Sequence, residues 1–385
     1  MKKIYLDYAA TTPVDPRVLA SMMPYFSKKF ANTMSLHEMG QIASEAVENS
    51  RKIIASYINA KTEEIYFTSS ATESNNLALK GVPFGSCEKE KNHIIISSIE
   101  HDCVLESSRW LQRQGFKVDE LDVDKDGFVD INQLKKLINK STVLVSVIHG
   151  NNEIGTVQDI ETIGKICREN GVYFHTDASQ SLGKVEIDVE KMNIDLLTAS
   201  SHKIYGPKGA AILYVKKGVI IEPIIHGGGH EKGLRSSTSN VPAIVGMGKA
   251  IEILQKEGKK ENNRLEKLRD LLIKEILENI KGTHLNGPIN RLSNNANISF
   301  PSIEGESLLM ELDFEGVEVS TGSACSSRNL MPSHVLMALG AKPQTAHGSI
   351  RLSVGRFTTK EEINKAVKIF IKVVNKLKKF SPFSI

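Results

Sequence analysis

The sequence predicts an α/β protein with a mostly parallel sheet covered by helices on both faces, followed by a smaller α+β domain. Short apolar runs alternate with helical patterns along much of the chain, which is the rhythm of consecutive βαβ units. Several of these runs end in polar residues, and ligands of open α/β sheets gather outside the carboxyl ends of the strands. Near Ala250 this rhythm gives way to one long, highly charged helical pattern.

The elements of the first domain follow one another along the chain. Short apolar runs are typical of strands buried in a parallel sheet, and they lie at Asn92–Ile99, Val143–Ile148, Val172–His175, Leu196–Thr198 and Ala211–Val215. Apolar residues at helical spacing lie between them at Leu105–Gln114, Ile131–Ile138 and Ile160–Glu169. We therefore expect strands and helices to alternate.

The second domain is predicted to follow a long helix over residues 250–281. Shorter elements come after this helix: turns at Gly287–Pro288 and Asn294–Asn295, and strands around Asn297–Phe300 and Val317–Ser320. We expect a large domain of residues 16–255 and a small domain formed by residues 1–15 and 256–385.

The composition excludes several classes of protein. Of the 385 residues, 40% are hydrophobic and 24% charged, which is ordinary for a globular protein. The net charge of +4 is small and argues neither for nor against binding of nucleic acid. We expect no direct DNA binding, and the basic run Lys372–Lys379 favours a solvated helix face over a site for an acidic partner. No signal peptide or membrane-spanning run is recognisable. We therefore expect a cytoplasmic protein without membrane attachment.

No metal site is expected. The four cysteines form no C-x-x-C pair and have no zinc-site spacing; they are Cys87, Cys103, Cys167 and Cys325. The run Asp122–Gly127 matches the start of a calcium-binding EF-hand loop, but the twelfth position is Gln133 instead of glutamate. An Asp-rich turn is therefore the favoured interpretation. His226 and His230 flank three glycines, which are poor helix formers, so their spacing does not indicate a metal site.

A candidate anion site lies at Thr68–Asn76, between a strand-like run and a helical pattern. Ser70 and Glu73 have the spacing of a capping box at a helix start. The N–H groups and the dipole of such a helix attract anions, although a capped helix without a ligand is the simpler alternative. Asp177 ends an apolar strand, where its carboxylate either pairs with a cationic nitrogen in a cleft or caps a turn.

Two residues are candidates for covalent chemistry. Lys203 follows two serines and a histidine at the end of a strand. Partial burial there would lower its pKa and favour Schiff-base chemistry, whereas a surface lysine before a Gly-Pro turn is the alternative. Cys325 lies in the small, polar run Ser320–Ser327, which suits an exposed, reactive thiol. Cys103 and Cys167 instead fit burial as small apolar residues.

These motifs, in this order, resemble the NifS/IscS group of cysteine desulfurases, within the class V aminotransferase family of fold-type I pyridoxal-phosphate enzymes. The resemblance runs from Tyr5–Pro13 to Gly348–Thr359. Between them lie ATESNN at 71–76, EHD at 100–102, NNEIGTVQDI at 151–160, HTDASQSLGK at 175–184, SSHKIYGPKG at 200–209, GGGHEKGLRSST at 227–238 and GSACSS at 322–327. Each motif alone is weak, but the ordered set is specific. It implies a seven-stranded sheet and a small domain that carries the cysteine loop.

The resemblance implies a role for each candidate residue. Lys203 would hold pyridoxal 5'-phosphate covalently, and Asp177 would keep its pyridine nitrogen protonated, which makes the ring an electron sink. His101 would stack on the ring and shuttle protons. The other implied cofactor contacts are Ala71, Thr72, Gln180, Ser200, His202 and, from the second subunit of a homodimer, Thr238. Asn152 and Arg351 would bind the substrate carboxylate, with Arg351 as a bidentate fork.

The implied reaction removes sulfur from L-cysteine. Lys203 would take the Cα proton, the Cys325 thiolate would attack the sulfur, and alanine would leave a persulfide on Cys325. The sulfur would pass to an acceptor protein for iron–sulfur assembly, thio-cofactor synthesis or tRNA thiolation. Family members that dock the iron–sulfur scaffold have a longer C-terminal tail than the segment after Arg356 in this sequence. The identity of the acceptor protein therefore stays open. A selenocysteine lyase and a non-catalytic sulfur-carrier subunit are the alternatives, and Lys203 argues against the second.

Overall fold

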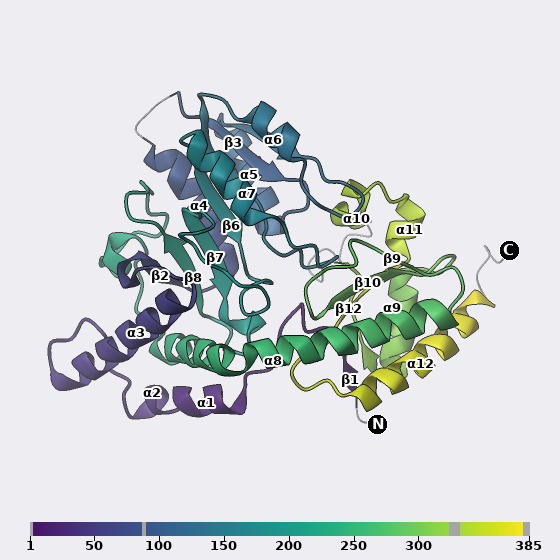
Figure 1. The fold of residues 1–385 in the computed structure, drawn as a ribbon. Coiled ribbons are helices and arrows are strands. Elements are labelled where there is room, and N and C mark those ends of the chain that lie inside the picture. Colours follow the sequence, from purple (N-terminus) through teal and green to yellow (C-terminus); the bar gives the residue numbers. More distant parts are fainter. Residues whose placement is uncertain (1–2, 87–89, 323–331, 380–385) are drawn as a thin grey trace.

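Seven strands form one mixed sheet at the centre of the larger part of the molecule (Figure 1). The computed structural model describes residues 3–86, 90–322 and 332–379. Only β8 runs antiparallel to its neighbours. In spatial order the strands are β2 (Ile65–Thr68), β8 (Ala211–Val215), β7 (Leu196–Ser200), β6 (Tyr173–Asp177), β5 (Thr142–Ser146), β3 (His93–Ser97) and β4 (Lys117–Leu121). The predicted mostly parallel, seven-stranded sheet is confirmed.

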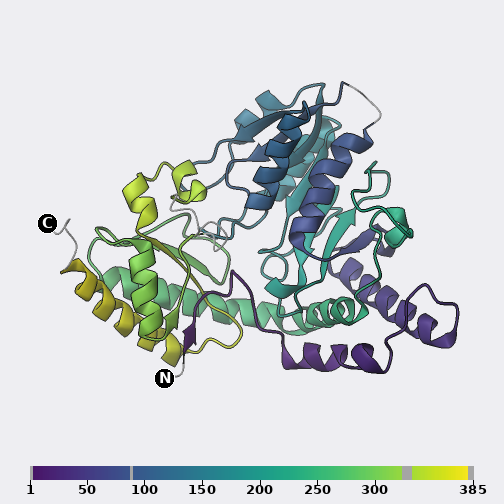
Figure 2. The same ribbon diagram turned by 180° about the vertical axis from the view of Figure 1, so that it is seen from behind.

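Helices cover both faces of this sheet (Figure 2). The helices up to residue 169 are α1 (Pro16–Met22), α2 (Pro24–Ser27), α3 (Glu38–Tyr57), α4 (Ala71–Gly85), α5 (Asp102–Arg113), α6 (Ile131–Leu137) and α7 (Ile160–Glu169), and the short 3-10 turns are η1 (Thr62–Glu64), η2 (Ser201–Lys203) and η3 (Glu231–Gly233). Of these helices, α1 and α2 lie away from the sheet (Figure 1). Ile95 of β3 shares an apolar cluster with α3 and α7, whereas Ile94 and Ile96 share another with α4 and α5. This alternation follows from the two-residue period of a strand.

A single long helix, α8 (Val241–Asn279), connects the two parts of the molecule (Figure 1). The predicted start near Ala250 is wrong by nine residues, because the prediction followed the charged part of the helix. The first turns are instead apolar and buried, as at Ile244 and Met247. Asn240 caps the helix by accepting a hydrogen bond from the Ala243 N–H, as is favourable at this position.

The smaller part packs around the second half of α8. Its elements are β1 (Ile4–Tyr5), β9 (His284–Leu285), β10 (Asn295–Ser299), α9 (Gly305–Phe314), β11 (Val317–Glu318), α10 (His334–Ala338), α11 (Pro343–His347), β12 (Ser349–Ser353) and α12 (Lys360–Lys378). Leu6 shares one apolar core with Leu272 and Phe370, so both ends of the chain contribute to it. The domain boundary between residues 255 and 256 stays a prediction.

The Asp-rich run Asp122–Gly127 forms a turn. The Asp124 carboxylate accepts hydrogen bonds from the N–H groups of Asp126 and Phe128, both at 2.9 Å. Gln133 donates to the Asp122 carboxylate at 2.9 Å. Within the described ranges, no group of three or more His, Cys, Asp or Glu side chains is arranged to hold a metal ion. No helix in that part of the chain is long and apolar enough to cross a membrane.

Candidate active site

A cavity of about 260 Å³ lies at the carboxyl ends of the strands, where an open α/β sheet is expected to bind its ligands. The connections that leave β2, β3, β5, β6 and β7 all contribute to it, and β12 adds one residue from the smaller part. The residues that were predicted and line it are Ala71, Thr72, His101, Asn152, Asp177, Gln180, His202, Lys203 and Arg351. The cavity is also lined by Ala9, Ala10, Ser70, Cys103, Ile148 and Ser179.

Lys203 ends the 3-10 turn that follows β7 and points its amine into the site. Its Nζ donates hydrogen bonds to the carbonyl oxygens of Ala9 (2.6 Å) and Ala10 (2.9 Å). Burial, together with the cations of Arg351 and Lys184, lowers the pKa of Lys203 to about 8. Lys203 is therefore a partly buried cavity residue and not a surface lysine before a turn.

This lowered pKa predicts the reactivity of the apoprotein. We expect pulse labelling of Lys203 by an amine-directed reagent to rise with pH about a midpoint near 8, because only the neutral amine is a nucleophile. Mass spectrometry of the labelled peptides measures this. Ordinary exposed lysines titrate near about 10.4, so a midpoint in that range for Lys203 would contradict the prediction.

Asp177 ends β6 and is almost fully buried at the cavity wall. Its carboxylate accepts hydrogen bonds from Asn75 Nδ2 at 2.6 Å and from the Ser179 N–H at 2.8 Å. These bonds fix the direction of the carboxylate. Sequence reasoning missed Asn75, although it follows Ala71 and Thr72 by four and three residues in α4, a spacing that places side chains on one helix face.

His101 is the N-cap of α5, and its Nδ1 accepts a hydrogen bond from the Cys103 N–H at 3.2 Å. Because Nδ1 accepts, the neutral ring carries its proton on Nε2. Cys103 Sγ lies 3.1 Å from both His101 Nδ1 and Asn75 Nδ2. Cys103 is partly buried against an apolar cluster, as predicted, but it also lines the cavity, which the sequence did not predict. Burial, with Asp177 nearby, raises the pKa of Cys103 to about 12, so its thiol stays protonated and is a poor nucleophile.

The start of α4, the candidate anion site, borders the cavity, and its cap differs from a complete capping box. Ser70 Oγ accepts a hydrogen bond from the Glu73 N–H at 3.1 Å. The Glu73 carboxylate accepts from the Ser69 N–H at 3.0 Å instead of from Ser70. It also forms an ion pair with Arg235 at 2.6 Å. The first N–H groups of the helix, at Ala71 and Thr72, border the cavity, where they favour a negatively charged group.

Arg351 brings a buried cation from β12 to the same cavity and is 2% exposed. Its Nη2 donates to Asp7 Oδ1 at 2.9 Å, whereas Nε is buried without a hydrogen-bond partner among the described residues. Leaving such a group unpaired is costly, and a guanidinium binds carboxylates well. Arg351, with Asn152 beside it in the lining, is therefore suited to a ligand carboxylate.

Three predicted site residues lie elsewhere or cannot be placed. Ser200 ends β7 and is buried, but it does not line the cavity. Thr238 lines a separate surface hollow together with Ser69 and Arg235. Cys325 lies outside the described residues. The assignments to these three residues stay predictions.

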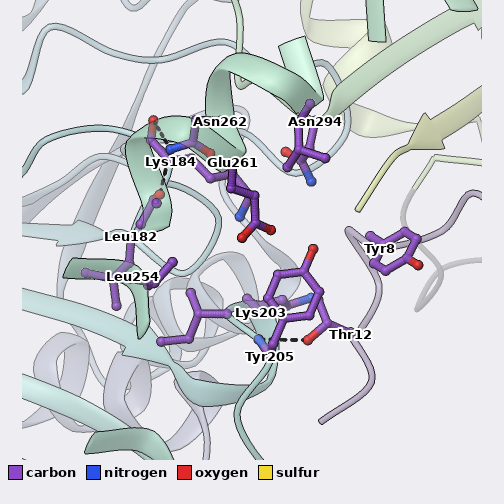
Figure 3. Close-up of a pocket in the computed structure, with 14 residues that line it drawn as sticks. Tyr8, Thr12, Leu182, Lys184, Lys203, Tyr205, Leu254, Glu261, Asn262 and Asn294 are labelled. Carbon is purple, nitrogen blue, oxygen red and sulfur yellow. Dashed lines mark hydrogen bonds between the residues drawn. The ribbon is translucent and has the colours of Figure 1, made fainter. Parts of the chain in front are cut away.

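A smaller pocket of about 20 Å³ borders Lys203 on the side of α8 (Figure 3). Tyr205, Glu261 and Lys184 contribute to its lining. Lys184 Nζ donates to the Gln180 carbonyl oxygen at 2.8 Å, and burial lowers the pKa of Lys184 to about 8. A second partly buried lysine therefore lines a pocket shared with Lys203 but lies outside the larger cavity.

Comparisons with known proteins place this geometry in a family. A family model described as aminotransferase class-V matches residues 4–366. The chain belongs to this family. The cysteine desulfurase IscS of Dictyoglomus turgidum is 49% identical over 383 residues, which cover 99% of this chain and 97% of that protein. A solved NifS-like protein has a TM-score of 0.92 at 39% identity and covers 97% of this chain and 100% of its own. The solved SspA in complex with cysteine has a TM-score of 0.80 at 40% identity and covers 93% of this chain and 100% of its own.

Enzymes of this family depend on pyridoxal phosphate, and the cavity fits that cofactor. Lys203 supplies a buried amine of lowered pKa, and Asp177 supplies a fixed carboxylate. The start of α4 is suited to a phosphate. Ser179 Oγ also borders the cavity and is buried without a partner among the described residues, as is expected of a group that awaits a polar ligand. The predicted family, fold type and cofactor are confirmed.

Proposed function

We propose that this chain is a pyridoxal-phosphate-dependent cysteine desulfurase that transfers the sulfur of L-cysteine to Cys325. The observation that carries the proposal is the meeting, in one cavity, of the Lys203 amine with the unpaired Nε of Arg351. An amino acid offers both the carboxylate that Arg351 requires and a Cα proton for a base. The names of the relatives specify which amino acid this is.

Different residues of the cavity bind the substrate, remove its proton and hold the cofactor. Arg351 and Asn152 bind the substrate carboxylate and orient Cα toward Lys203. The neutral Lys203 amine, available near pH 8, removes the Cα proton. The bound cofactor supplies the electron sink that stabilises the resulting negative charge. His101 holds a proton on Nε2 for the reacting substrate, and Asp177 presents its negative charge to the cationic ring nitrogen.

The sulfur acceptor is a thiolate, and Cys325 is the cysteine that we assign to this role. Its sulfur attacks the substrate sulfur, the carbon–sulfur bond breaks, and L-alanine leaves while Cys325 becomes a persulfide. Burial raises the pKa of Cys103 and of Cys167, which argues against either of them as the nucleophile. The persulfide sulfur then passes to an acceptor protein of iron–sulfur assembly, thio-cofactor synthesis or tRNA thiolation.

Product analysis tests this function. We expect the holoenzyme, incubated with L-cysteine and a thiol reductant, to release alanine and sulfide in equal amounts. Without reductant, mass spectrometry after one turnover is expected to find one additional sulfur on the Cys325 peptide. Pyruvate in place of alanine, or additional sulfur on Cys103, would contradict the proposal. Selenocysteine turnover that exceeds cysteine turnover would indicate a selenocysteine lyase instead.

The proposal includes a homodimer in which Thr238 serves the cofactor of the second subunit. The hollow that contains Thr238 adjoins the cavity, because Ser69 lines the hollow while Ser70 lines the cavity. Thr33 Oγ1 lies 3.4 Å from Ser239 Oγ, and Ser239 lines the same hollow. The segment around Thr33 exposes six apolar side chains, which we call the apolar surface: Leu19, Met23, Phe26, Phe30, Met34 and Leu36. Such a concentration of apolar side chains favours a protein interface, and the adjoining Thr238 favours a second copy as its occupant.

We expect Phe30→Glu to dissociate the dimer, because Phe30 is 68% exposed in the single chain and a charge in an apolar interface is costly. Light scattering after size-exclusion chromatography measures the mass. The control is Phe314→Glu, since Phe314 is 84% exposed on α9, far along the chain from the apolar surface. Equal masses for the two variants would exclude this surface as the interface.

A further inference from the structure

A half-buried arginine connects the turn that carries Lys203 with the strand that carries Arg351. Arg356 lies between β12 and α12, five residues after Arg351. Its backbone N–H donates a hydrogen bond to the Tyr205 hydroxyl oxygen at 2.6 Å. Its guanidinium carbon lies 4.1 Å from the centroid of the Tyr205 ring, within the range of a cation–π interaction. Tyr205 in turn follows Lys203 by two residues.

The same guanidinium forms two ion pairs that reach two further segments. Its Nη1 donates to Asp15 Oδ2 at 2.6 Å, and its Nε donates to Glu261 Oε2 at 2.9 Å. Glu261 belongs to α8 and lies with Tyr205 beside Lys203 in the smaller pocket (Figure 3). Asp15 caps α1. Because all these partners are part-buried or buried, the ion pairs are less screened by solvent than surface pairs.

Tyr205 has a backbone conformation that requires external support. Its φ of +65° lies in the left-handed region, which a bulky side chain rarely adopts. Such strain persists only where the surrounding structure holds it, and it gathers at functional sites. The Tyr205 N–H donates to Thr12 Oγ1 at 2.9 Å, and its carbonyl oxygen accepts from the Asp15 N–H at 2.9 Å. Arg356 holds the Tyr205 side chain through the hydrogen bond to its hydroxyl oxygen and the cation–π contact with its ring.

The segment after β12 is itself fixed to α8. Arg264 donates hydrogen bonds to the carbonyl oxygens of Thr358 at 2.8 Å, Gly355 at 3.1 Å and Arg356 at 2.8 Å. A continuous series of contacts therefore leads from Arg351, along β12, through Arg356 and Tyr205, to Lys203. No other described arginine both stacks on a residue of the Lys203 turn and follows the strand of Arg351.

We propose that Arg356 is a positioning residue that sets the place of the Lys203 amine relative to Arg351 by holding Tyr205 in its left-handed conformation. The proposal rests on the proposed function, which gives Lys203 the Cα proton and Arg351 the substrate carboxylate. Both groups act on one small molecule. A displacement of either one therefore reduces the rate steeply, because reaction requires near-contact geometry.

The test compares Arg356→Gln with Arg269→Gln in the cofactor-loaded enzyme. Arg269 is a matched control, since it is also a buried arginine that pairs with carboxylates and donates to two carbonyl oxygens, but it lines neither of the two pockets that border Lys203. We expect Arg356→Gln to shift the pH midpoint of the yellow cofactor band, which reports on the Lys203 nitrogen, to raise KM for cysteine, and to lower kcat/KM about tenfold or more. Arg269→Gln is expected to lower the melting temperature without moving the pH midpoint.

A milder variant keeps the proposal testable if Arg356→Gln does not fold. Tyr205→Phe keeps the ring under the guanidinium but removes the acceptor of the Arg356 N–H, so we expect a smaller shift of the same pH midpoint. An unchanged midpoint and KM in the variant that folds would overturn the role of Arg356. This test is independent of the test of the proposed function. A wild-type enzyme without cysteine turnover would refute the function. The pH midpoint of the yellow band would still show whether Arg356 positions Lys203.

Discussion

Lys203→Ala is expected to abolish the yellow absorption band of the purified protein and to lower cysteine turnover by about 10³-fold or more. In the proposed function the same amine attaches the cofactor and removes the Cα proton, so the substitution removes two contributions at once. Its environment suits both tasks: burial and two neighbouring cations lower its pKa to about 8, so a substantial share of the amine is neutral at moderately alkaline pH. Absorption spectra and alanine release measure the two losses.

Lys184→Gln is the matched control for this experiment. Lys184 is also a partly buried lysine with a pKa lowered to about 8, but its Nζ donates to the Gln180 carbonyl oxygen, and the residue lines the smaller pocket and not the larger cavity. We expect Lys184→Gln to keep the yellow band. If Lys203→Ala kept the band as well, another lysine would hold the cofactor. Partial recovery of Lys203→Ala activity by a small added amine would support the role of Lys203 as a base.

Local sequence patterns were sufficient for the strands and for the residues at their ends. The run Ala211–Val215 coincides with β8, and the helical pattern Ile160–Glu169 coincides with α7. The same patterns put Asp177 and Lys203 at the carboxyl ends of strands, which share one edge of the sheet, but left their roles open. The resemblance to the family supplied the roles. Each of these features depends on residues that are close together in the chain, where periodicity carries information.

Contacts between distant segments could not be predicted in this way. Asn75 binds Asp177 across 102 positions of sequence, and Arg356 reaches Tyr205 across 151 positions. Cys103 was expected to be buried as a small apolar residue, and it is partly buried, but its place in the cavity lining beside His101 could not be predicted. Only tertiary packing determines such pairings. The part of the site that positions the reacting groups was therefore less predictable than the reacting groups themselves.

Asp177→Asn is expected to lower turnover by about 10²- to 10³-fold while leaving the fold intact. In the proposed function the Asp177 carboxylate faces the cationic ring nitrogen of the cofactor, so the substitution removes this negative charge from a buried site, where screening by solvent is weak. The hydrogen bonds can be restored: Asn75 Oδ1 is buried without a partner among the described residues, so a half-turn of the Asn75 amide lets it accept from the new side-chain amide. The Ser179 N–H keeps an oxygen acceptor.

Asp195→Asn separates this loss of charge at the site from a general cost of replacing a buried aspartate. Asp195 precedes β7, and its carboxylate accepts a hydrogen bond from the Phe174 N–H at 3.0 Å. Burial raises the pKa of Asp195, so it is also an aspartate in a poorly solvated place, but it does not line the cavity. We expect Asp195→Asn to retain turnover within about twofold, since it touches no group of the site. Equal losses in both variants would mean that the effect of Asp177→Asn arises from the sheet and not from the charge beside the cofactor.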